Sequence, residues 1–168
     1  MSTATSTINI TAVNDAPVAT ITPASYSNTE QVSLNLKANG LSISDADAGS
    51  SSMTVTLSVT EGTLTVTAGT SGATVTNSGT SSVTITGTVA QVNALLNTNA
   101  TSTVSYVDNT DTPSATSTLT LSVNDNGNTG TGGSLVSTAT STINITAVND
   151  APVITSGNGA TASSPVNG

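Results

Sequence analysis

Carboxylates are the residues of this chain that could do chemistry, and they are few and selectively placed. The chain has nine acidic side chains, one lysine, no histidine and no cysteine, with a formal net charge of −8. Five of the acidic residues lie beside Gly, Asn, Ala or Pro in loops at predicted strand ends: Asp15, Asp45, Asp47, Asp125 and Asp150. Oxygen ligands without nitrogen or sulfur donors suit Ca²⁺, which takes about six to eight of them. The loops therefore predict calcium binding, although Asp and Asn are also common turn formers.

The same inventory argues against an enzyme. General acid–base catalysis near neutral pH relies on His, or on a carboxylate or Lys with a shifted pKa. Hydroxyl groups are plentiful, but none has a base to activate it as a nucleophile. Paired carboxylates such as Asp45 and Asp47 can in principle cleave glycosides, yet a cation site or a solvated loop explains them better. We therefore expect no catalytic activity.

Composition also excludes two kinds of partner. Lys37 is the sole basic side chain, so the chain lacks the basic patch on which nucleic-acid binding depends. No apolar run approaches the length that spans a bilayer. We expect no nucleic-acid partner and no membrane insertion.

Two identical stretches organise the chain: residues 2–18, the first copy, and residues 137–153, the second copy. Both read STATSTINITAVNDAPV. Alternating Ile and polar residues predict a half-buried strand, and the Asn-Asp-Ala-Pro that follows ends it, because Pro cannot donate to a sheet. The spacing predicts a tandem array with a repeat of about 135 residues, enough for a core.

The repeat divides the chain into three parts. Residues 1–16 are the last strand and junction of a preceding repeat, residues 17–150 a complete repeat, and residues 151–168 the frayed start of the next. The fold has one slot for the repeated strand. Since the second copy arrives through the Gly-rich loop 127–133, we expect residues 137–148 to fill the slot and residues 1–13 to project as a loose or edge-paired strand.

Apolar alternation predicts an antiparallel Greek-key β-sandwich with one short capping helix. Residues 53–59 form the clearest alternating run, and Glu61-Gly62 predicts a hairpin into residues 64–68. The segment holding Tyr26 and Glu30 is expected to be a loop, followed by a strand through Val32, Leu34 and Leu36. Lys37 is expected to be solvated on the outward face. Helical spacing in residues 88–96 begins with Thr88 and Gln91, which fit a capping box.

Three motifs resemble the cadherin-like tandem repeats of giant bacterial type I-secreted, RTX-associated surface adhesins. They are Val-Asn-Asp-Ala-Pro-Val at residues 148–153, Ile-Ser-Asp-Ala-Asp-Ala-Gly at residues 43–49 and Val-Asn-Asp-Asn-Gly-Asn at residues 123–128. The resemblance covers residues 17–153 and implies Ca²⁺ bound between consecutive domains. The ligands it implies are Glu30, Asp45, Asp47, Asn149 and Asp150, with Asp15 serving the upstream junction. The junction lacks the leading Asp of the cadherin pattern.

The residues and the resemblance together predict a structural extender repeat of a secreted or cell-surface bacterial adhesin, stiffened by Ca²⁺ at its junctions. Its partners would be neighbouring repeats of the same chain, with a cell surface or carbohydrate as a further partner. The alternative is a β-sandwich module that binds carbohydrate or a host surface. That alternative needs an exposed aromatic platform or a pocket, and Tyr26 and Tyr106 are the only aromatic residues.

Overall fold

The computed structural model describes residues 1–150 and shows an all-β sandwich with one short helical segment. The first strands are β1 (Val18–Ile21), β2 (Ser25–Thr29), β3 (Leu34–Asn35), β4 (Leu41–Ser44), β5 (Met53–Val59) and β6 (Thr63–Thr67). The later elements are β7 (Thr74–Thr76), β8 (Ser82–Gly87), α1 (Val89–Asn93), its π-helical extension (Ala94–Thr98), β9 (Thr103–Val107), β10 (Thr116–Asn124) and β11 (Val136–Thr146). In the described residues, no helix is long and apolar enough to cross a membrane.

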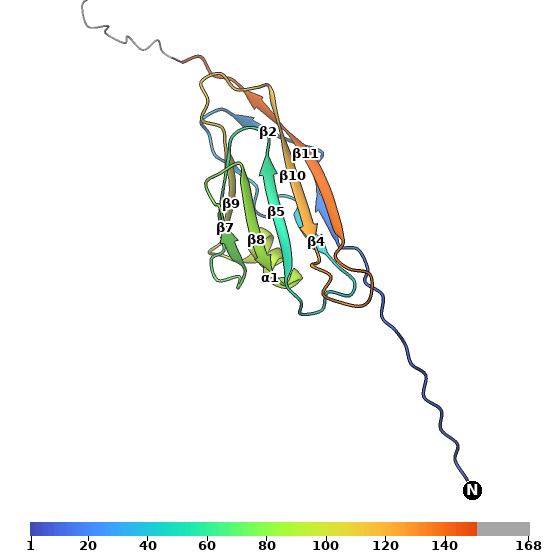
Figure 1. Cartoon of the computed structure of the whole chain (residues 1–168). Coiled ribbons are helices and arrows are strands. Elements are labelled where there is room, and N and C mark those ends of the chain that lie inside the picture. The colour runs from blue at the N-terminus through green and yellow to red at the C-terminus, as the bar shows by residue number, and fades with distance from the viewer. Residues whose placement is uncertain (151–168) are drawn as a thin grey trace, which may run out of the picture.

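The strands form one large sheet and two small ones (Figure 1). The large sheet has the order β2-β11-β10-β5-β8-β7, and the smaller sheets are β3-β9-β6 and β1-β4. Both neighbours of β5 come from distant parts of the chain, which is the non-sequential order of a Greek-key sandwich. The pairs are antiparallel except β2 and β11, which run parallel.

Strict alternation on β5 explains the core. Met53, Val55, Leu57 and Val59 are buried, while the intervening Thr and Ser residues lie partly exposed on the other face. Successive side chains of a strand point to opposite faces, so one face of the large sheet packs against the smaller sheets and the helix. Thr wets the outer face without adding charge.

The predicted hairpin at Glu61-Gly62 is wrong. Both strands exist, but β5 pairs with β8 and β10 in the large sheet, whereas β6 pairs with β9 in the three-stranded sheet. Residues 60–62 therefore carry the chain from one sheet to the other. Alternation identifies the face a strand buries but not the strand beside it, and a tight turn is compatible with either connection.

The predicted loop around Tyr26 is also wrong. Residues 25–29 form β2, whose single aromatic side chain is buried and whose backbone pairs with β11. The expected strand through residues 32–36 shrinks to β3, and Val32 is exposed. A segment rich in Ser and Asn has weak strand propensity, so tertiary pairing with β11 decides its conformation.

The helix begins as predicted. The Thr88 hydroxyl accepts from the Gln91 backbone N–H, and the Gln91 side chain accepts in return from the Thr88 N–H. This reciprocal pair satisfies backbone donors that have no partner within the helix. Lys37, expected to be solvated, instead lies partly buried and donates from Nζ to the carbonyl oxygens of Asn99 and Ser102 beyond the helical segment.

The second copy fills the slot in the sheet, as expected. Residues 136–146 form β11 between β10 and β2, whereas the described residues 1–12 contain no strand and extend from the body as a tail (Figure 1). The N-terminal tail and the C-terminal end of β11 lie at opposite ends of the molecule (Figure 1). The assignment of residues 1–16 to a preceding repeat stays a prediction, and the expected fraying of residues 151–168 concerns positions outside the described residues.

Candidate metal site at the two ends of the domain

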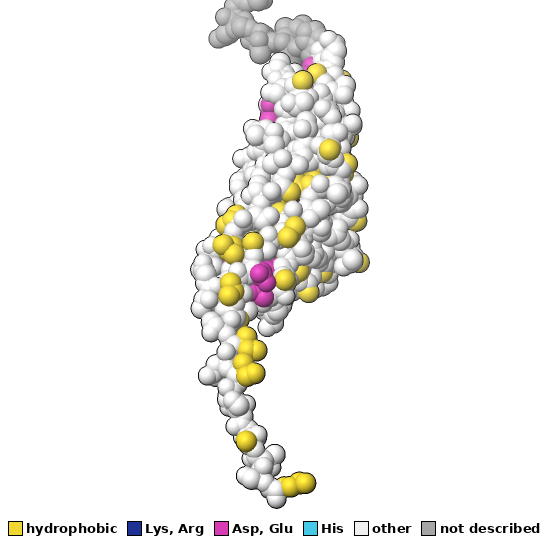
Figure 2. Space-filling model, turned by 90° about the vertical axis from the view of Figure 1, so that its right-hand side faces the viewer, with side chains coloured by type: hydrophobic (Ala, Val, Ile, Leu, Met, Phe, Trp, Pro, Cys, Tyr) yellow, Lys and Arg dark blue, Asp and Glu magenta, His cyan; other side chains and the backbone are white. Residues whose placement is uncertain are grey.

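The nine carboxylates divide between the two ends of the sandwich. At the end where the N-terminal tail enters, the leading end, lie Asp15, Asp45, Asp47 and Asp125. At the opposite end, the trailing end, lie Glu30, Glu61, Asp108, Asp111 and Asp150. Figure 2 shows acidic side chains gathered where the tail joins the body and others towards the opposite end. Charge is thus concentrated at the two ends of the domain.

The leading end brings together the predicted loop and the predicted junction. Asp45 Oδ1 accepts from the backbone N–H of Asp47 (3.1 Å) and of Ala48 (3.0 Å), which closes the loop after β4. Asp47 Oδ2 accepts from the backbone N–H of Asp15 (3.1 Å). One oxygen on each loop carboxylate, Asp45 Oδ2 and Asp47 Oδ1, is buried and has no hydrogen-bond partner among the described residues.

The surroundings of Asp45 disfavour its charged form. Partial burial raises the pKa of Asp45 above its ordinary value, and the adjacent Asp47 carboxylate adds to the effect, against the opposing influence of the two backbone N–H donors. A raised carboxyl pKa means that the environment disfavours the charged form. A cation between the two carboxylates would reverse that preference.

Asp125 differs from the other predicted ligands at the leading end. Its Oδ1 accepts from the backbone N–H of Gly127 (2.8 Å) and Leu135 (2.7 Å), and its Oδ2 accepts from the Asn14 side-chain amide (2.6 Å). Asp125 is therefore engaged by protein donors on both oxygens. Sequence reasoning did not include Asn14 among the site residues, although its equivalent Asn149 was included.

At the trailing end, Glu30 is only 1% exposed. Its Oε1 accepts from the backbone N–H of Val148 (2.7 Å), directly before the Asn149-Asp150 pair. Its Oε2 is buried and makes no hydrogen bond within residues 1–150. Burying a carboxylate with one oxygen unsatisfied is costly, so this atom fits a site that receives a cation from outside the domain.

Asp108 was not among the site residues that the sequence singled out. It is fully buried, and its carbonyl oxygen accepts from the backbone N–H of Gln31, the residue after Glu30. Its carboxylate accepts from the Thr110 backbone N–H (3.1 Å) and hydroxyl and from the Tyr106 hydroxyl (3.4 Å). Burial and then the Asp108 charge raise the pKa of Tyr106 to about 12. Only the contact between the residues that follow β2 and those that follow β9 brings Asp108 to Gln31, next to Glu30 in the chain.

The predicted ligands are therefore brought together in part. Asp15, Asp45 and Asp47 meet at the leading end, while Glu30 lies near the start of the second junction and Asn149 and Asp150 are exposed. Within residues 1–150, no three acidic side chains form a cluster that could hold a metal ion. The unpartnered oxygens at both ends still fit the oxygen chemistry of Ca²⁺.

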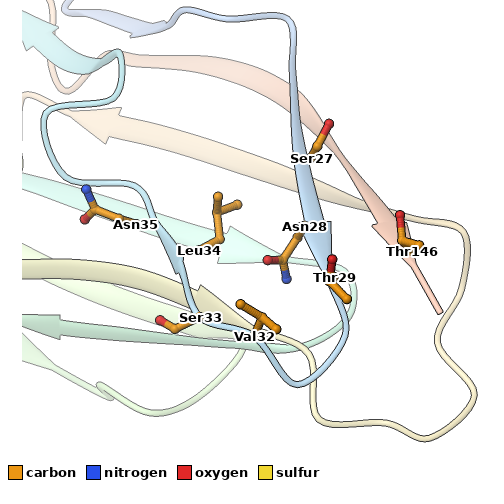
Figure 3. Close-up of a pocket in the computed structure, with 8 residues that line it drawn as sticks. All are labelled: Ser27, Asn28, Thr29, Val32, Ser33, Leu34, Asn35 and Thr146. Atoms are coloured by element: carbon orange, nitrogen blue, oxygen red, sulfur yellow. The ribbon is translucent and has the colours of Figure 1, made fainter. Parts of the chain in front are cut away.

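A shallow pocket lies beside the trailing end, between β2 and residues 32–35 (Figure 3). Its volume is about 330 Å³, and its lining is mainly polar. The Asn28 side chain reaches from β2 toward the facing segment (Figure 3), and its Nδ2 has no partner among the described residues. Tyr26 and Tyr106 are both buried, so neither offers the exposed platform that a carbohydrate module would need.

Comparison with known protein families found no matching family model, and comparison with curated proteins found no match.

Proposed function

We propose that this chain is a structural extender, one repeat of a secreted or cell-surface bacterial adhesin whose junctions are stiffened by Ca²⁺. The observation that carries the proposal is the set of buried, unpartnered carboxylate oxygens at the two ends: Glu30 Oε2 at the trailing end, with Asp45 Oδ2 and Asp47 Oδ1 at the leading end. In a tandem array, the trailing end of one repeat faces the leading end of the next.

The ion site would be shared between two repeats. One repeat supplies Glu30 together with Asn149 and Asp150 of its junction, and the next supplies the equivalents of Asp45 and Asp47. Within the described chain, the first junction already contacts the loop that holds Asp45 and Asp47, because the Asp15 N–H donates to Asp47. Asp108, which is buried at the same end, adds negative charge to the trailing end.

The mechanism is electrostatic and mechanical. Without an ion, the carboxylates at the junction repel one another, and the environment of Asp45 disfavours its charge. With Ca²⁺, oxygens from both repeats coordinate a common ion, which restricts the angle between them. An array of such junctions becomes a stiff rod that holds a distant part of the parent protein away from the cell.

The alternative of a carbohydrate- or host-binding module has less support. The pocket beside β2 is open and polar, and it lacks an aromatic side chain among its lining residues. A glycan array tests this alternative directly, because specific binding by the single repeat would favour it over the extender.

The deciding experiment is Ca²⁺ titration by calorimetry on this chain and on a chain of two complete repeats. We expect the two-repeat chain to bind Ca²⁺ more tightly, and its maximum dimension in solution scattering to increase when Ca²⁺ is added. Glu30→Gln in the first repeat should weaken that binding, since Gln retains an acceptor for the Val148 N–H but removes the charge.

Asp111→Asn is the matched control. Asp111 is exposed at the same end and, among residues 1–150, accepts only from the Gln31 side chain (3.3 Å), so the substitution removes one charge without touching the buried oxygen. Equal Ca²⁺ binding by the Glu30→Gln and Asp111→Asn variants would show that Glu30 is not a ligand of the calcium site. An unchanged maximum dimension with and without Ca²⁺ would refute the rod mechanism.

A further inference from the structure

The residues that precede the first junction are seated on a loop of the domain they enter. The backbone N–H of Thr131 donates to the Ala12 carbonyl oxygen (3.0 Å), and the Asn14 N–H donates to the Thr131 carbonyl oxygen (3.1 Å). Val13 and Thr131 form an isolated parallel bridge between these bonds. Residues 12–14 thus add a short strand-like contact to the loop 125–134, which joins β10 to β11.

The Asn14 side chain extends this contact into the loop. Its Nδ2 donates to Asp125 Oδ2 (2.6 Å) and to the Gly133 carbonyl oxygen (2.9 Å), and Asn14 is only 6% exposed. Asp125 is held from the other side by the N–H groups of Gly127 and Leu135. Burial alone would raise the pKa of Asp125, but the N–H donors of Leu135, Gly127 and Asn14 together hold it below its usual value. The carboxylate is therefore charged, and it accepts charge-assisted hydrogen bonds.

Gly130 provides an independent sign that the loop is shaped for this segment. A Cβ at Gly130 would lie 2.6 Å from the Val13 carbonyl carbon and 2.7 Å from the Asn14 nitrogen. Backbone atoms cannot yield as a flexible side chain can, so only glycine allows the segment to approach so closely. The loop thus combines a buried acceptor with a gap that matches the incoming backbone.

We propose that the loop 125–134 of each repeat is a receptor for the end of the preceding repeat, and that Asn14 is the residue that latches the two together without an ion. The partner is another repeat of the same kind, because residues 147–149, near the end of this repeat, are identical to residues 12–14. There Asn149 is exposed, and it would dock into the loop of a following repeat.

The latch shares only Asn149 with the proposed calcium site and uses none of the carboxylates of that site. Every bond in it runs from an N–H or hydroxyl group to an oxygen of the protein, and Asp125 directs both its oxygens at N–H donors. Asn14 presents its amide nitrogen to Asp125, so this atom acts as a donor and not as a metal ligand. The junction is therefore held by direct hydrogen bonds even when the carboxylates of Asp45 and Asp47 have no cation.

Amide hydrogen exchange on this chain in excess chelator tests the proposal. The Asn14 and Thr131 amides should be protected without Ca²⁺. Asn14→Ala should speed their exchange about tenfold or more, since a hydrogen bond to a charged group is worth at least that factor. Asn149→Ala is the matched control and should change neither amide, because the same residue is exposed there.

A second pair of variants guards against an unfolded protein. Gly130→Ala and Gly133→Ala impose similar strain, with φ of +80° and +76°, but a Cβ at Gly133 would meet nothing within 4 Å in the described part of the chain. Only Gly130→Ala should release residues 12–14. Protection that appears only with Ca²⁺, or that is lost equally in both glycine variants, would overturn the latch. Neither result bears on calcium binding at Glu30, which calorimetry reports separately.

Discussion

The two copies of the repeated stretch have the same sequence and opposite environments. In the first copy, Ile8 and Ile10 are 83% and 90% exposed, whereas the equivalent Ile143 and Ile145 of the second copy are 0% and 8% exposed. The junction halves show the reverse, since Asn14 is buried and Asn149 is exposed. Burial is therefore reversed between the copies: the strand residues are buried in the second copy, and the junction asparagine is buried in the first.

Chain connection explains which copy occupies the sheet. The second copy follows β10 through the loop 125–134, so β11 can turn back and pair with β10 along nine residue pairs. The first copy enters from the leading end and is held there at residues 12–14. To reach the same slot it would have to reverse across Pro17, which opposes a tight reversal.

The largest expected effect comes from truncating the same isoleucine in each copy. Ile143→Ala should lower the free energy of unfolding by roughly 3 kcal/mol, because a fully buried side chain leaves a cavity, while Ile8→Ala should change it by less than about 0.5 kcal/mol. Chemical denaturation of both variants measures the difference. Similar losses for the two would mean that the copies exchange places in the slot.

Added Ca²⁺ should stabilise this chain through its first junction. That junction contacts the loop of Asp45 and Asp47, so Ca²⁺ at a hundredfold excess over its Kd should stabilise the chain by about 2.7 kcal/mol if it binds only the folded state. The melting temperature reports this stabilisation by Ca²⁺, and Asp45→Asn with Asp47→Asn should remove most of it. Asp111→Asn, at the trailing end, should retain it.

The same double variant has a consequence in chelator. Burial and the neighbouring charge raise the folded pKa of Asp45, so ionisation at neutral pH opposes folding, and stability should increase as the pH falls toward that pKa. Neutral side chains remove the penalty, and the variant should be at least as stable as the parent without Ca²⁺. A large loss of stability in chelator would show that the two carboxylates support the fold by themselves.

A smaller effect is expected at alkaline pH, where the ionisation of Tyr26 tests whether β11 is paired with β2. Tyr26 lies opposite Ile143 in the register of β2 and β11, and burial raises the pKa of its phenol. Its neutral form is favoured in the folded state, so the stability it contributes is present below the ordinary pKa of 10.0 and is lost as the pH rises through the folded pKa. Ultraviolet absorbance should show delayed ionisation of both tyrosines, because the pKa of Tyr106 is raised as well, and Tyr26→Phe should leave only the Tyr106 step. Ionisation at the ordinary pKa would place Tyr26 in water and β11 out of register.

The smallest effect should follow removal of residues 1–11. This deletion leaves residues 12–14 on their loop and takes away exposed side chains only, so the melting temperature should barely change. Any concentration-dependent dimer should become weaker, because a free strand that matches an occupied slot invites exchange between molecules. Analytical ultracentrifugation measures the dimer, and a marked loss of stability would show that the tail is built into the sheet.

Local patterns in the sequence were sufficient for much of the fold. Alternation identified β5 and β6, and the Thr88–Gln91 capping box identified the start of the helix, because both depend on neighbours within a few residues. The Asp45–Asp47 loop was likewise recognisable from its composition. Asp108 and the role of Asn14 were not, since each depends on a contact with a residue distant in the sequence.

Residue patterns alone predict a β-sandwich that contains a repeated strand and carries its carboxylates in loops. They do not reveal that β5 and β6 lie in different sheets, that residues 25–29 form a strand beside β11, or that one copy is buried where the other is exposed. The physical reason is that a period of two specifies which face of a strand is apolar. The partner across the sheet is instead chosen by chain connection and by burial summed over the whole domain.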